Sequence, residues 1–196
     1  MRKLREPKVR KYTRNYGKVI GSKRFYGNWR MLNVTSAQRC QAVTWYRDAG
    51  YDCENFAKEF GLSLAVACAV VSAWSPRMRW DRNLLVAREH MQGKKHLGMD
   101  KSAKRADRVL VHGIDALNTP TGHKTHNFAW NLFGDYDAVT IDTHMISAAG
   151  LEQESVSSGL MYEELSQAVR RLAKRHGLRN AEMQALIWIA KRGSAN

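Results

Sequence analysis

The sequence predicts an all-α protein, and three observations lead to this prediction. Apolar residues recur at helical spacing along most of the chain after residue 33. Glycines or helix-capping residues separate these periodic segments. Alternating strand patterns are missing, and the apolar piece at 138–141 is too brief to seed a sheet. We therefore expect a helical domain over residues 34–196, preceded by an arm at 1–33.

Capping residues and glycines delimit the first two expected helices. Thr35 or Ser36 can cap a helix that ends at Gly50. Asp52 can cap a short second helix, which Gly61 closes.

The next helix is expected to be central in the core. Ser63 opens the segment 64–74, which is apolar on nearly every side, and a Ser-Pro step ends it. An amphipathic helix is expected at 79–91. Another is expected at 101–111, with basic residues on its outer face.

The remaining helices follow a turn-rich segment, and two of them begin at ionisable residues. A hairpin at 116–126 leads into a helix that starts at Lys124, and Asp142 can cap the next. After a Ser-rich loop, the last two helices are expected at 161–176 and from a cap at Asn180.

The amino-terminal arm carries most of the positive charge. Residues 1–33 hold eleven Lys and Arg against one Glu, which is +10 of the formal net charge of +14. Because cations attract phosphates and the interleaved aromatic rings can stack on bases, we expect the arm to bind nucleic acid. A solvated tail that only aids solubility is the alternative. The arm residues expected to contact DNA are Lys11, Arg14, Lys23 and Arg24.

Cysteine usage and hydropathy indicate a cytoplasmic protein with no membrane partner. Cys40, Cys53 and Cys68 form no metal-ligand spacing, and an odd, scattered set is typical of reduced thiols. No apolar run reaches the ~18–20 residues that a membrane span needs.

An amine and a carboxylate stand at two successive helix starts. Lys124 and Asp142 are 18 residues apart, separated by an apolar helical segment and a turn. Two such groups can face one cleft, where the amine attacks a sugar carbon and the carboxylate stabilises the cation that forms. The amine must be neutral, which burial and cationic neighbours such as His123 and His126 would favour. The plainer alternatives are an N-cap role for Asp142 and a phosphate contact for Lys124.

The same stretch resembles the helix-hairpin-helix DNA glycosylases of the endonuclease III type. The family pattern G-[RH]-K-T-A-N is matched by GHKTHN at 122–127, and V-D-T-H by VTIDTH at 139–144. The family hairpin L-P-G-V-G is replaced by LNTPTG at 117–122, so Pro120 is expected to reshape it. Segments 75–83 and 184–188 look like a group of small bacteriophage proteins related to these enzymes.

The resemblance implies a compact helical domain of the glycosylase type that excises a damaged or modified base from duplex DNA. Lys124 is the implied nucleophile, which adds a lyase step, and Asp142 the implied charge stabiliser. Trp74 ends the buried helix where relatives carry the last residue of L-S-A-Q, and either a wedge into the base stack or a core position is expected for it. The other residues implied to contact DNA are Arg77, Arg79, Thr121, Gly122, His123, Thr125 and His144.

No metal or cluster is expected. No cysteine follows Cys68, so the iron–sulfur cluster that many relatives carry near the C-terminus cannot be built. The histidines lack the carboxylate or cysteine partners of a zinc site. The family hairpin often holds a monovalent cation through backbone carbonyls, and the resemblance leaves that cation open here.

Three other functions remain alternatives. The first is a non-catalytic, sequence-tolerant DNA-binding protein of the same fold, favoured by the altered hairpin and the basic arm. The second is a phage enzyme of base hypermodification, and the third a phage inhibitor whose partner is a host protein. A phage origin would place the protein in the cytoplasm of the bacterial host.

Overall fold

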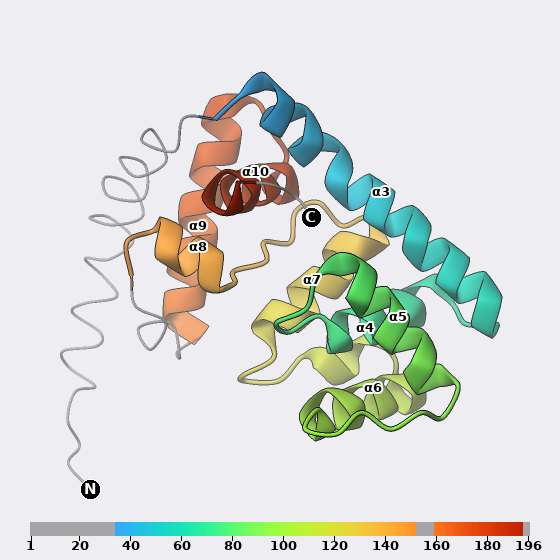
Figure 1. Cartoon of the computed structure of the whole chain (residues 1–196). Helices are drawn as coiled ribbons and strands as arrows, with labels where there is room; N and C mark the ends of the chain where they lie inside the picture. Colours follow the sequence, from blue (N-terminus) through green and yellow to red (C-terminus); the bar gives the residue numbers. More distant parts are fainter. Residues whose placement is uncertain (1–33, 152–158, 194–196) are drawn as a thin grey trace, which may run out of the picture. The chain divides into compact units, whose positions relative to one another are not determined.

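The computed structural model describes residues 34–151 and 159–193, and every regular element in these residues is helical (Figure 1). The all-α prediction is therefore confirmed. Residues 34–42, 141–151 and 159–193 belong to one compact unit, unit 1, and residues 43–140 to a second, unit 2. The elements are α3 (Ser36–Phe60), α4 (Leu64–Trp74), α5 (Trp80–Met91), α6 (Asp100–His112), the 3₁₀ turn η2 (Ile114–Leu117), α7 (His123–Phe133), α8 (Thr143–Ala148), α9 (Gly159–His176) and α10 (Asn180–Arg192).

Helix α3 is continuous through Gly50, so the prediction of two helices separated there is wrong. The expected cap is present: Gln38 N donates to Thr35 Oγ1 over 3.1 Å, and Thr35 N donates to Gln38 Oε1 over 3.0 Å. A Cβ added at Gly50 would lie 3.2 Å from the carbonyl oxygen of Leu132 in α7. This glycine therefore allows two helices to approach closely and does not end one.

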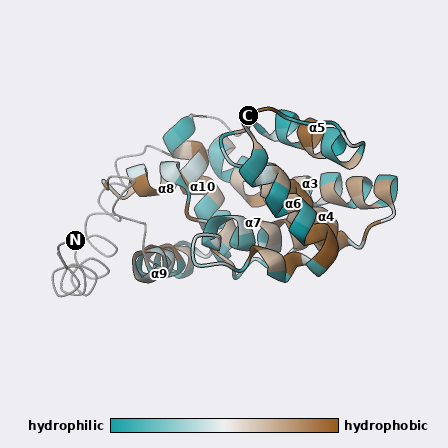
Figure 2. Cartoon of the chain, turned by 90° about the horizontal axis from the view of Figure 1, so that it is seen from below, coloured by the Kyte–Doolittle hydropathy of each residue, from teal (hydrophilic) through white to brown (hydrophobic). Residues whose placement is uncertain are grey.

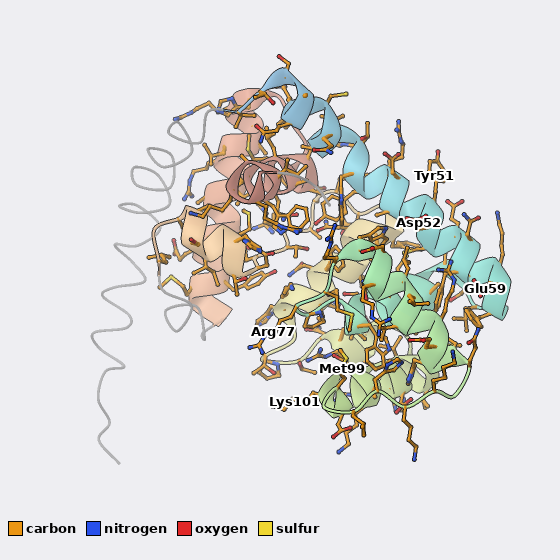
Figure 3. All side chains as sticks on the ribbon, viewed as in Figure 1. Tyr51, Asp52, Glu59, Arg77, Met99 and Lys101 are labelled. Atoms are coloured by element: carbon orange, nitrogen blue, oxygen red, sulfur yellow. The ribbon has the colours of Figure 1, made fainter. Side chains whose placement is uncertain are left out.

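Asp52 lies within α3 and caps no helix, contrary to the prediction. Its Oδ2 accepts a hydrogen bond of 2.7 Å from Nε1 of Trp80, the first residue of α5. Further along α3, Glu59 forms a 2.8 Å salt bridge with Arg88 of α5. Asp52 and Glu59 are labelled along α3 in Figure 3, and their two contacts tie α5 to α3.

Helix α4 forms the core of unit 2, as its all-round apolar pattern predicted. Residues 67–74 are all buried, and the helix packs against α5, α6, η2 and α7. In Figure 2, α4 is coloured largely as hydrophobic. Ser63 caps it, because its Oγ accepts a hydrogen bond of 3.4 Å from Val66 N.

The buried side-chain amide of Asn131 stabilises the segment that follows α7. Asn131 donates from Nδ2 to the carbonyl oxygens of Asp135 (2.9 Å) and Ala138 (2.8 Å). Its Oδ1 accepts a hydrogen bond of 2.8 Å from Thr140 Oγ1. Because Asn131 is fully buried, this satisfied network fixes the path of residues 135–140.

In unit 1, α10 packs against both α8 and α9. Asn180 is the first residue of α10 and not its cap, which corrects the prediction. The N-cap position belongs to Arg179, whose backbone N–H donates to Glu182 Oε2 over 2.8 Å while its guanidinium holds Oε1 of the same carboxylate. Helix α9 also begins earlier than expected, at Gly159.

Within the described ranges, no single helix is long and apolar enough to cross a membrane. Helices α3 and α4 pass that test only when they are taken together, and they bend by 109° at the break between them.

Candidate functional site

A crowded turn leads into the helix that carries Lys124. Its last hydrogen bond runs from Gly122 N to the carbonyl oxygen of Thr119 over 2.8 Å. Gly122 has a φ of −95°, which any residue can adopt. A Cβ there, however, would overlap the carbonyl oxygen of Leu117 and lie 2.5 Å from Thr119 Oγ1. Glycine is therefore required at position 122 because the backbone of Leu117 approaches it so closely. No residue from 118 to 122 has a positive φ, so the turn can accommodate Pro120.

The first turn of α7 is anchored from the inside of unit 2. Thr125 is 4% exposed; its hydroxyl donates to the carbonyl oxygen of Gly122 (3.0 Å). Its carbonyl oxygen accepts a hydrogen bond of 2.6 Å from Ser72 Oγ of α4. The side chain of Thr125 is thus internal, whereas we had expected it at a DNA-binding surface. The adjacent Lys124 is half-buried.

Ser72 was not identified as a site residue from the sequence. The sequence does contain a signal that could have identified it, because Ser72 is a hydroxyl residue within an otherwise apolar helix. Such a group must find a hydrogen-bond partner on a neighbouring element.

Phe128, one helical turn after Lys124, and the three aromatic rings around it are here named the aromatic cluster. The centroid of Phe128 lies 6.1 Å from that of Trp45, 6.3 Å from that of Trp80 and 6.2 Å from that of Tyr46. The rings of Trp45 and Trp80 are 5.6 Å apart, and both are half-buried. Residues four apart share a helix face, so Lys124 projects from α7 on the side of this cluster.

The aromatic cluster was also missed from the sequence. Its rings come from α3, α5 and α7, and no local pattern links positions so far apart in the chain. Such rings pack the three helices together, and half-buried indoles can in addition stack on a planar ligand.

His126 is neutral in the structure. Its Nε2 accepts a hydrogen bond of 3.0 Å from Trp130 Nε1, which requires a free lone pair and leaves the proton on Nδ1. Burial lowers the pKa of His126; nearby Asp115 opposes this effect, and His123 adds to it. His126 therefore supplies no positive charge beside Lys124 at neutral pH, contrary to our expectation.

Trp74 occupies the core position, one of the two alternatives for this residue. It is 0% exposed, and its ring lies 5.1 Å from that of His90 and 5.3 Å from that of His96. Its Nε1 has no hydrogen-bond partner among the described residues. In this conformation the indole is not at the surface, so it cannot act as a wedge.

The two arginines after α4 are exposed, as a DNA contact requires. Arg77 has a φ of 62°, which is unusual for a residue with a Cβ and is a form of strain that concentrates at functional sites. Figure 3 shows it on the turn that follows α4. Arg79 is exposed at the N-cap position of α5. Thr121, on the turn before α7, is exposed too.

In unit 1, Asp142 is the N-cap of α8, as predicted. Its Oδ1 accepts a hydrogen bond of 2.9 Å from Met145 N. His144, in the same first turn, is exposed, and its ring meets that of Trp188 edge-on with centroids 6.4 Å apart. The guanidinium of Arg192 lies 4.5 Å over the Trp188 ring. This row of an imidazole, an indole and a guanidinium can take up a base or a phosphate.

The predicted site residues thus fall into three groups. Those around Lys124 and after α4 belong to unit 2, whereas Asp142 and His144 belong to unit 1. The four arm residues, Lys11, Arg14, Lys23 and Arg24, lie outside the described residues. Trp188 and Arg192 were missed, although their spacing of four in a helix is the signal of a stacked pair.

The cysteines differ in their surroundings. Cys40 is exposed, while Cys53 and Cys68 are buried and unlinked. A hydrogen bond to Cys68, together with burial, raises the pKa of the Cys53 thiol. Over residues 34–151 and 159–193, no group of three or more His, Cys, Asp or Glu could hold a metal ion.

Comparisons with known proteins give one match. No curated protein and no solved structure matches the chain. A model described as "Family of unknown function (DUF7178)" matches residues 23–195, which include both units and the whole stretch from Gly122 to His144. Because this match covers most of the sequence, the chain belongs to the DUF7178 family.

Proposed function

We propose that this protein is a DNA glycosylase of the helix-hairpin-helix type, which excises a damaged or modified base from duplex DNA. The observation that carries the proposal is the paired motif, GHKT followed 18 residues later by DTH. Two local features support it: Lys124 lies in the first turn of α7, and Asp142 caps α8. These are the positions that the resemblance implies for a nucleophile and a charge stabiliser.

In the proposed reaction the bond between the sugar C1′ and the base nitrogen breaks. Its electron pair leaves with the base, which is then protonated. The carboxylate of Asp142 stabilises the positive charge on the sugar. Attack by the neutral amine of Lys124 on C1′ gives a Schiff base after ring opening, and this adduct leads to strand cleavage.

The aromatic cluster supplies a place for the extruded base. Extrusion costs a few kcal/mol of lost stacking and pairing. Stacking of one base on an aromatic side chain contributes about 1–3 kcal/mol, so half-buried Trp45 and Trp80 can offset much of that cost.

The test is a single-turnover assay on duplexes that each carry one modified base, with borohydride added to trap a Schiff base. We expect abasic product and a trapped adduct with the natural protein, and no adduct with Lys124→Ala. The matched control is Lys58→Ala, which removes an exposed lysine of the same unit and should leave both products. A broad panel without abasic product or adduct would overturn the proposal.

A non-catalytic DNA-binding protein of the same fold is the second candidate. Two observations favour it: Trp74 is buried and so does not replace a flipped base, and Pro120 stands where the family hairpin carries glycine. This candidate predicts tight binding that tolerates any sequence and survives Lys124→Ala, with no product from any duplex.

A further inference from the structure

One face of α6 carries four basic residues, which we name the α6 basic face: Lys101, Lys104, Arg105 and Arg108. Their spacing of three, four and seven places them on the same side of the helix. Lys101, Lys104 and Arg108 are exposed, and Arg105 is half-buried. Figure 3 shows Lys101 at the first turn of α6.

Among the described residues, no carboxylate pairs with the cations of the α6 basic face. Asp107, on the same helix, is instead 3.2 Å from His90 Nε2. The face therefore presents a concentrated positive charge to solvent, which favours a bound anion.

Two of the guanidinium groups stand close enough to repel each other. Burial lowers the pKa of Arg105, and the charge of Arg108 lowers it further. Arg108 is itself directed toward the hairpin, because its Nη2 donates to the carbonyl oxygen of Ala116 over 3.4 Å. A phosphate between the two groups would relieve this repulsion, and guanidinium geometry suits phosphate oxygens.

We propose that the α6 basic face is a docking surface for the phosphate backbone of duplex DNA. It rests on the proposed function for the choice of DNA, and does not depend on base excision. From Lys101 to Arg108 the helix rises roughly 10 Å, at 1.5 Å per residue. Three nucleotides of one strand advance by roughly the same distance along the duplex, so the face matches two or three successive phosphates.

The other polyanion that a basic helix can meet is an anionic membrane surface. A helix that lies in the membrane interface uses an apolar face as well as its positive charge. The apolar side of α6, with Ala106 and Val109, is buried, and α6 packs against α4 and η2. The exposed apolar side chains Leu110 and Val111 stand together at its last turn and form no face along its length. The surface is therefore better suited to a nucleic acid.

The experiment compares two triple variants of the full chain, each with three positive charges removed. The first carries Lys101→Gln, Lys104→Gln and Arg108→Gln. The matched control carries Arg47→Gln, Lys58→Gln and Lys95→Gln, which are exposed residues of unit 2 outside α6. Affinity for an unmodified duplex of about two helical turns is measured by fluorescence anisotropy over a series of salt concentrations, with vesicles of phosphatidylserine as a second probe.

For the first variant we expect the slope of log K against log salt to become shallower by about 2 to 3, and the affinity to fall on the order of tenfold or more. The control should change the slope far less. Equal slopes in both variants would show a general charge effect and overturn the proposal, as would binding to the vesicles in place of the duplex. Lys104→Glu alone serves as a milder change if the triple variant unfolds, and it should weaken binding in the same direction.

The excision assay separates this inference from the proposed function. If the natural protein yields no product but the two variants differ in slope, the glycosylase proposal fails and the docking surface stands. If excision occurs and the slopes do not differ, the docking surface fails alone.

Discussion

The hydroxyl of Ser72 donates a hydrogen bond of 2.6 Å to the carbonyl oxygen of Thr125, in the interior of unit 2. This contact joins the core helix α4 to the first turn of α7, next to Lys124. A helix start is usually its loosest part, because its first N–H groups lack partners within the helix. Here a buried hydroxyl from another helix holds that turn in place, so the position of Lys124 depends on the core.

Replacement of Ser72 tests that dependence. We expect Ser72→Ala to lower the free energy of unfolding by about 1 kcal/mol, the net contribution of a typical hydrogen bond. The measurement is urea unfolding followed by circular dichroism. Ser166→Ala is the control, since Ser166 donates only to Tyr162 of its own helix and should change stability less. Equal losses would show that the contact to α7 has no special weight.

The role of Asp142 as a helix cap can be tested separately from the role of its negative charge. Asparagine caps helices about as well as aspartate, so Asp142→Asn should retain stability, whereas Asp142→Ala should lose about 1 kcal/mol. Under the proposed function both variants lose excision, because neither carries the carboxylate. Thermal unfolding and single-turnover product formation give the two readouts. Full excision by Asp142→Asn would contradict a role for the charge.

Gly122 should tolerate no side chain. In Gly122→Ala the new methyl group meets the carbonyl oxygen of Leu117, a backbone atom that cannot move alone. We expect a loss of about 1–3 kcal/mol, the usual cost of overpacking. Thr121→Ala, at the exposed neighbouring position, should stay within about 0.5 kcal/mol of the natural protein. An unchanged midpoint in urea for Gly122→Ala would mean that the turn relaxes freely.

The lowered pKa of His126 predicts a dependence of stability on pH. The unfolded chain takes up this proton first as the pH falls below about 6.5, because the ordinary histidine pKa exceeds that of His126 in the folded state. The contribution of His126 to the free energy of unfolding is therefore complete above that pH, and it is lost as the pH falls through the folded-state pKa. Protonation of Nε2 also breaks the bond from Trp130.

The measurement is the thermal midpoint from pH 8 to pH 5, with the pH range chosen around that reference value. In His126→Gln the thermal midpoint should decline less below neutral pH, since the glutamine at position 126 does not titrate. His112→Gln removes an exposed histidine of the same unit and serves as the comparison. A steeper decline in His126→Gln would contradict the assignment.

The glycines show which parts of the fold the sequence could predict. Gly61 ends α3 with a φ of 65°, and its place after a periodic segment was enough to predict this. Gly50 has the same local appearance but lies inside α3, because the chain returns 82 residues later and brings the carbonyl oxygen of Leu132 against it. Local rules could not distinguish the two, since the difference arises from tertiary packing.

In the candidate site, too, local features could be predicted from the sequence, whereas features that depend on tertiary packing could not. The cap at Asp142 depends on the next three residues, so the pattern predicted it correctly. Asp52 also resembled a cap, but its partner is Trp80, on another helix. The burial of Trp74 and the gathering of rings around Phe128 depend on which helices meet, and a single sequence does not state that.

The three cysteines have a practical consequence. Thiol reagents act on the thiolate of an accessible cysteine, and a raised pKa together with burial protects Cys53, as burial protects Cys68. Under native conditions a maleimide dye should therefore attach at Cys40 alone. The natural chain thus offers one labelling position for fluorescence without the removal of any cysteine.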